Sequence, residues 1–148
     1  MSARPPETGA LRAEVLSLAV RECEESCRAH AAACLAGSDA IGPGDADREE
    51  CVNLILDCAY TSSATARALR HFERGDLEVA VMLVAACARL AARCGAACER
   101  HASVEALWTL ASASRECASS CTAVLDILRV RAAVEPVEPE AMIGGSAA

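Results

Sequence analysis

The side chains with the clearest chemical potential are ten cysteines, three of which share one short segment with a histidine. Cys87, Cys94, Cys98 and His101 follow one another at intervals of seven, four and three residues. An α-helix returns to the same face every three or four residues, so these four side chains would lie along one side of a helix. Thiols spaced in this way are close enough to share a metal ion.

The remaining cysteines repeat this spacing in other segments with a helical pattern. In the predicted helices 10–36, 46–74, 77–101 and 103–132, the inward positions advance by alternating steps of three and four residues, as in a bundle. These stripes hold three, two, three and two cysteines, which accounts for all ten. The thiols are therefore predicted to face one core: Cys23, Cys27, Cys34, Cys51, Cys58, Cys87, Cys94, Cys98, Cys117 and Cys121.

Helix-ending and capping residues predict the boundaries of these helices. Gly37 should end the first helix, and either Asp45 or Asp47 can cap the second. Asp76 follows a glycine and should cap the third helix, and Ser103 should cap the fourth. Modest connections between four long helices predict an all-α fold, an antiparallel up-down-up-down four-helix bundle with its cysteines facing the core.

Length and composition agree with a single helical domain. The 148 residues suit one domain, and the low aromatic content of 2% favours closely packed helices over sheet. We expect a flexible leader at 1–9, a metal-storage bundle at 10–132, and a disordered tail rich in Pro and Gly at 133–148.

Several classes of function are disfavoured by the sequence. The net charge of -7 argues against a nucleic-acid surface, and the N-terminal residues lack the long apolar run of a signal peptide or membrane anchor. A reducing cytoplasm is then expected, where cysteine-rich chains bind metals more often than they form disulfides. We expect no enzyme, because no nucleophile with an adjacent base, phosphate loop or Glu-x-x-His pair occurs.

The chemistry of the thiols favours several Cu(I) ions. Thiolates select Cu(I), zinc and iron–sulfur clusters over hard cations. Structural zinc sites usually draw on Cys-x-x-Cys pairs, which are absent, and ferredoxin spacings are absent too. Each monovalent ion bridged by sulfurs would neutralise the charge of about one thiolate. This ratio suits a buried column of thiols, because buried charges must be paired.

Counting residues along each helix predicts the depth of each side chain. Cys34, Cys51 and Cys98 should lie near the end of the bundle that carries His101, with His30 about one turn deeper. Ala91 should leave a gap in the third helix at the depth of Cys27 and Cys58. A metal cluster at that depth would then be held by the other three helices.

Four motifs resemble those of a known family. They are Cys23-Glu-Glu-Ser-Cys27, the segment from Cys51 to Cys58, Cys94-Gly-Ala-Ala-Cys98-Glu-Arg-His101 and Cys117-Ala-Ser-Ser-Cys121. Over about residues 15–128 the sequence resembles the four-helix-bundle copper storage proteins, in particular their cytosolic branch. The resemblance implies a homotetramer that stores many Cu(I) ions on core cysteines, loads them through a mouth near His101, and exchanges them with a copper donor or acceptor protein.

The chain departs from that family pattern at five positions on the same inward stripes as the cysteines. His30, Ile55, Ser62, Ala91 and Ser114 stand where such proteins commonly place further cysteines. We therefore expect a smaller capacity, on the order of 5 to 10 Cu(I) per chain. The predicted metal ligands are the ten cysteines together with His101 and His30.

Other interpretations remain open at this stage. The bundle could be a structural or protein-interaction module whose cysteines are only small core residues, or a sensing or delivery protein. A redox or iron–sulfur protein is a third class. Met82 is expected to fill the core rather than bind metal, His71 to lie on the surface, and Tyr60 and Trp108 to pack between chains.

Overall fold

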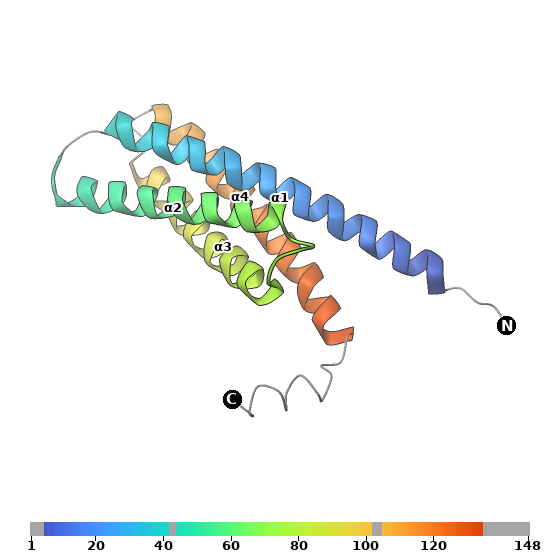
Figure 1. The fold of residues 1–148 in the computed structure, drawn as a ribbon. Helices are drawn as coiled ribbons and strands as arrows, with labels where there is room; N and C mark the ends of the chain where they lie inside the picture. Colours follow the sequence, from blue (N-terminus) through green and yellow to red (C-terminus); the bar gives the residue numbers. More distant parts are fainter. Residues whose placement is uncertain (1–4, 42–43, 102–104, 135–148) are drawn as a thin grey trace, which may run out of the picture.

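The computed structural model describes residues 5–41, 44–101 and 105–134, and within them the side chains of residues 9–130. This part of the chain forms four helices and no strand: α1 (Pro5–Ile41), α2 (Ala46–Arg70), α3 (Leu77–Arg100) and α4 (Glu105–Val134). Each helix packs against two neighbours, α1 and α3 both contacting α2 and α4, so the four surround one core (Figure 1). The predicted all-α antiparallel bundle is confirmed.

Two aspartates cap helices as their sequence positions suggest. The Asp45 carboxylate accepts the Arg48 backbone N–H at 3.0 Å, so Asp45 rather than Asp47 caps α2. The Asp76 carboxylate accepts the N–H groups of Glu78 and Val79 at 2.9 and 3.3 Å. Both carboxylates satisfy donors that an isolated helix start leaves unpaired.

The first helix is longer than predicted at both ends. It begins at Pro5, inside the segment expected to be a flexible leader, and continues through Gly37 to Ile41. Gly37 does not end the helix because it lies where α1 meets α4: a Cβ at this position would come within 2.8 Å of the Leu110 side chain. The glycine thus serves close helix packing rather than termination.

The other boundaries differ by a few residues. The second helix ends at Arg70, and a turn in which the Phe72 N–H donates to the Leu69 carbonyl replaces its predicted last residues. The fourth helix runs to Val134, two residues into the predicted tail. The predicted cap Ser103 and the tail residues 135–148 lie outside the described residues.

The predicted inward stripes form the core. All of their members are buried except Phe72 and His101, which are half-buried. Met82 was expected in the core, but it is 70% exposed. Ala80 and Val84 take the buried positions on either side of it, and a residue two positions away on a helix points to the opposite side.

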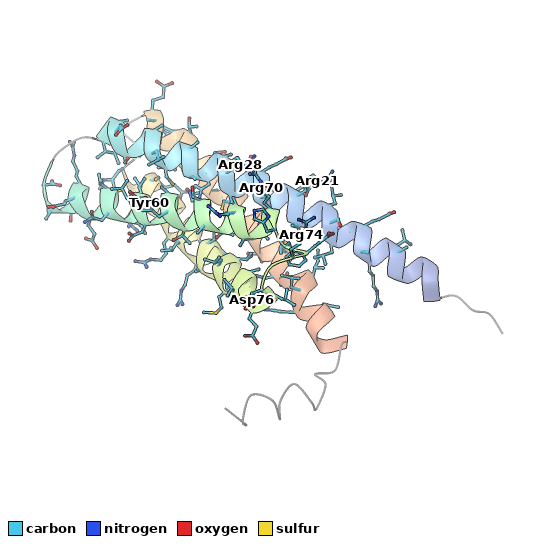
Figure 2. The ribbon with its side chains drawn as sticks, viewed as in Figure 1. Arg21, Arg28, Tyr60, Arg70, Arg74 and Asp76 are labelled. Atoms are coloured by element: carbon cyan, nitrogen blue, oxygen red, sulfur yellow. The ribbon has the colours of Figure 1, made fainter. Side chains whose placement is uncertain are left out.

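The outer surface carries two of the three aromatic residues and an ion-pair cluster. Tyr60 is 72% exposed on α2 (Figure 2), and Trp108 on α4 is 65% exposed. Arg28 and Arg70 both pair with the Glu24 carboxylate, which ties α1 to α2 across their outer face (Figure 2). His71 is exposed, as predicted.

One described helix, α3, is long and apolar enough to cross a membrane, with a mean hydropathy of 1.7 over its most apolar stretch. Its buried face contains Cys87, Cys94 and Cys98 and packs between α2 and α4. A core helix of a bundle meets the same criteria of length and composition, so this finding is weak evidence for a membrane span.

Candidate metal centre

All ten cysteines are buried, and none forms a disulfide. They divide equally between two core clusters along the bundle. We call Cys23, Cys27, Cys87, Cys117 and Cys121 the deep group. We call Cys34, Cys51, Cys58, Cys94 and Cys98 the mouth group, since it lies toward the end of the bundle that carries His101.

The deep group is a compact set of sulfurs centred on Cys27. Its Sγ atom lies 3.7 Å from those of Cys117 and Cys121, 3.8 Å from that of Cys87 and 4.0 Å from that of Cys23. Cys23 to Cys121 and Cys87 to Cys117 are both 3.6 Å. Two sulfurs on one ion can lie at most about twice the metal–sulfur bond of ~2.3 Å apart, so these distances suit shared metal ions.

Apolar side chains close the bundle below the deep group. They come from all four helices, are each no more than 8% exposed, and cover the deep group with apolar surface at that end: Leu16, Val20, Leu69, Val84, Val124 and Leu128.

The mouth group is looser and reaches a surface cavity. The sulfurs of Cys34 and Cys94 and a ring nitrogen of His30 lie within 4.8 Å of one another. Cys51 is 6% exposed and lines a cavity of about 470 Å³ between α2 and α3, which His101 also lines. His101 thus lies at the mouth, as predicted, where it also ends α3 by donating its backbone N–H to the Cys98 carbonyl at 3.2 Å.

Charged side chains surround the same cavity. Asp47 and Glu50 line it from α2, and Arg93 and Arg100 line it from α3. These residues were not singled out from the sequence, because on isolated helices they look like ordinary solvated positions. They become part of the mouth only when α2 and α3 pack together.

His30 lies between the two groups rather than at the upper mouth. Its Nδ1 and Nε2 atoms lie 2.9 Å from the hydroxyl oxygens of Ser62 and Ser114. All three side chains are buried. The sequence already placed these residues in phase with the cysteines, but only the structure shows that they meet in one layer.

The predicted depth of Ala91 was right for Cys58 and wrong for Cys27. Cys27 lies beside Cys87, so α3 does supply a thiol at the depth of Cys27. Cys58 lies higher, next to Ala91 as predicted, since its thiol donates to the Leu90 carbonyl at 3.3 Å. Counting residues from a common bundle end ignores the stagger between helices, which their packing sets.

A comparison with models of known protein families supports the interpretation of these thiols. Residues 11–126, most of the chain, match the model described as copper storage protein. The chain belongs to the copper storage protein family. A comparison with functionally curated proteins finds no significant match.

Solved structures of copper storage proteins resemble the chain in both sequence and fold. One is a cytosolic copper storage protein from Streptomyces lividans, in a structure of copper loading with five coppers. Its sequence is 35% identical to this chain, and the TM-score of the two folds is 0.71. The match covers 76% of this chain and 97% of the Streptomyces lividans chain. The Streptomyces lividans protein Ccsp loaded with 10 copper equivalents is 36% identical with a TM-score of 0.68, covering 73% and 84%. A mutant of the same protein has a TM-score of 0.70 at 36% identity, covering 74% and 94%.

Within this copper storage fold, hydrogen bonds between the thiols lower the pKa of some of them, most strongly that of Cys94 in the mouth group and that of Cys117 in the deep group. Hydrogen bonds with Cys34, Cys58 and Cys98 lower the pKa of Cys94, and they raise the pKa of those three thiols. In the deep group, hydrogen bonds with its neighbours, Cys121 first, lower the pKa of Cys117. These two sulfurs are the strongest candidates to receive a soft cation first.

The surroundings of His30 shift its pKa in opposite directions. Burial lowers the pKa of its imidazole, whereas hydrogen bonds with Cys117 and Cys94 and the negative charge on these thiolates raise it to about 9. Its charge therefore depends on whether the neighbouring thiols are ionised.

The metal-free protein is expected to lose stability above about pH 9. The pKa of Cys27, Cys34, Cys51, Cys58, Cys98 and Cys121 is raised in the fold, so these thiols keep their protons, while the unfolded chain ionises near 9.0. Unfolding then releases protons, and each such thiol lowers the free energy of unfolding by about 1.4 kcal/mol per pH unit.

Urea unfolding at pH 8 and pH 10, under anaerobic reducing conditions, measures this loss. Thiols with a lowered pKa, such as Cys23 at about 5, are already ionised in both states above pH 9 and add no slope there. Equal free energies of unfolding at the two pH values would contradict the prediction.

Proposed function

We propose that this protein stores several Cu(I) ions in the cytosol, bound between the sulfurs of its ten core cysteines. The observation that carries the proposal is the set of ten buried, unbridged thiols gathered into two groups inside a copper storage fold. Buried thiolates need neutralising cations, and Cu(I) supplies one positive charge per ion while accepting two or three bridging sulfurs. The cytosolic assignment rests on the description of the Streptomyces lividans relative.

The proposed ligands are the mouth group, the deep group and His101. His101 shares the surface cavity with Cys51, a position suited to receiving an ion before it enters the core. His30 lies close enough to Cys34 and Cys94 to complete a third site, provided that it first gives up a hydrogen bond to serine.

We further propose that the protein is a homotetramer and that a copper-carrying protein exchanges ions with it at the mouth. Outward-facing apolar residues on α1, Leu11, Val15 and Leu18, are 61%, 56% and 55% exposed along one stripe, which supports burial against another chain. In this proposal the protein stores copper and catalyses no reaction.

Anaerobic titration with Cu(I) against a chromogenic chelator tests the storage function. We expect on the order of 5 to 10 tightly held ions per chain, with the ultraviolet absorbance of Cu(I) thiolates and no visible bands. Fewer than about two tightly held ions per chain would reject copper storage and favour a structural or interaction bundle.

A matched variant separates lost ligands from lost structure. Replacing Cys94 and Cys98 together with Ser should lower the copper capacity while the helical circular dichroism stays unchanged. Loss of the helical signal in this variant would instead indicate that the cysteines serve mainly as packing residues.

A further inference from the structure

The layer of His30, Ser62 and Ser114 is a buried polar feature that copper storage on thiols does not itself require. Its three side chains are no more than 1% exposed and come from α1, α2 and α4. It lies between the mouth group and the deep group, and no other buried histidine occurs among the described residues. Apart from Thr65, the other buried side chains of the described core are thiols or apolar groups, so this polar layer requires an explanation.

The hydrogen bonds of this layer have a defined direction. The Ser114 hydroxyl donates to the Leu110 carbonyl at 2.7 Å, so its oxygen accepts the His30 Nε2–H. A neutral ring then presents its lone pair at Nδ1, to which the Ser62 hydroxyl donates. When the ring is charged, Nδ1 donates to Ser62 instead, so both contacts persist in either state.

This bonding holds the ring across the core. No described buried side-chain nitrogen or oxygen lacks a hydrogen-bond partner, and turning His30 away from the two serines would leave its ring nitrogens unsatisfied in a dry interior. The ring therefore stays across the core until at least one of its hydrogen bonds to serine breaks.

The thiol network is interrupted at the same place. Sulfur–sulfur contacts of 3.6–4.0 Å link the deep group, and Cys94 links the mouth group, but in the described part of the chain no sulfur–sulfur hydrogen bond joins one group to the other. From the layer, the Ser62 hydroxyl reaches the deep group at the Cys87 sulfur, 3.5 Å away. Since apolar side chains close the opposite end, the route for an ion from the mouth to the deep group runs past the layer of His30.

We propose that His30, held by Ser62 and Ser114, is a partition that divides the thiol column into two stores and limits the rate at which Cu(I) passes between them. The inference rests on the proposed storage function and deepens it. Passage is a ligand exchange: a bond from copper to a mouth-group sulfur breaks as one to a deep-group sulfur forms. The receiving thiol loses its proton, the released thiolate gains one, and copper stays Cu(I).

The chain offers an unusually direct way to follow this passage. Cleavage after arginine places the mouth-group cysteines in peptides 29–48, 49–67 and 94–100, and the deep-group cysteines in peptides 22–28, 75–89 and 116–129. No peptide mixes the two groups. Thiols that hold copper resist alkylation, so mass spectrometry of the alkylated peptides reports the occupancy of each store separately.

The experiment adds about half-saturating Cu(I) to the reduced full-length protein without oxygen, and alkylates samples over time. We expect protection of the three mouth-group peptides first and of the deep-group peptides at least about tenfold more slowly, because two buried hydrogen bonds must break. Replacing His30 with Cys supplies a thiol at the barrier and should remove most of that delay.

Two further variants keep the test decisive. Ser62→Ala combined with Ser114→Ala releases the ring without adding a sulfur, and it should also speed transfer. Thr65→Val removes a buried hydroxyl that bonds to Thr61 and Leu83 rather than to His30, and it should leave the delay unchanged.

Parallel protection of all six peptides in the parent protein would overturn the partition while leaving storage intact. An unchanged delay in both His30→Cys and the double serine variant would overturn it as well. Absence of protection in every peptide would reject storage and the partition together.

Discussion

Loading with Cu(I) is expected to raise the midpoint of thermal unfolding of this protein by at least about 20 °C. The thiols that would hold the ions come from all four helices, so bound copper would cross-link the whole bundle. Each ion that binds the folded chain at a thousandfold excess over its dissociation constant adds about 4 kcal/mol to the free energy of unfolding. Several ions per chain therefore add more than the usual total stability of a domain of this size.

Circular dichroism melts of anaerobic samples, with no copper and with five equivalents of Cu(I) per chain, measure the shift. Binding of copper to thiols of the unfolded chain would reduce the shift of the unfolding midpoint. The expected shift of at least about 20 °C allows for this reduction. A shift below about 5 °C at five bound equivalents would show that the ions do not join the helices, and it would contradict the proposed core location.

Replacing Cys27 and Cys117 together with Ala is expected to lower the copper capacity by roughly half, more than two lost ligands would suggest. Cys27 contacts every other sulfur of the deep group, and Cys117 also contacts Cys87. Removing both leaves three sulfurs, with Cys121 lying 3.6 Å from Cys23 and within 4.8 Å of Cys87, and three sulfurs are too few to bridge several ions.

The same chelator titration measures the loss, with Cys51→Ala as the matched control. Cys51 lies at the edge of the mouth group beside the surface cavity, so its removal should cost about one ion. The double variant should keep its helical signal, since alanine is a good helix former and only small side chains are lost. A loss in the double variant no larger than twice that in the control would contradict the central role of Cys27.

The sequence alone determined which side of each helix faces the core. The alternation of three and four residues depends only on the helical repeat, which backbone geometry sets for every residue. For that reason the burial of all ten cysteines, of His30 and of the two in-phase serines followed from spacing. The Asp76 cap followed too, because capping depends on a few consecutive residues. The prediction that Met82 fills the core was wrong. Met82 lies two positions from the buried Ala80 and Val84, and this places its side chain on the opposite side of the helix, toward solvent.

Only the tertiary structure decided the depth at which side chains from different helices meet. The stagger between helices depends on close contacts such as that of Gly37 with Leu110, where a residue expected to stop α1 lets it pass close to α4. Nothing within a single helix encodes that offset. The pairing of Cys27 with Cys87, the convergence of Asp47 and Arg100 at the mouth, and the division of ten thiols by His30 are all consequences of it.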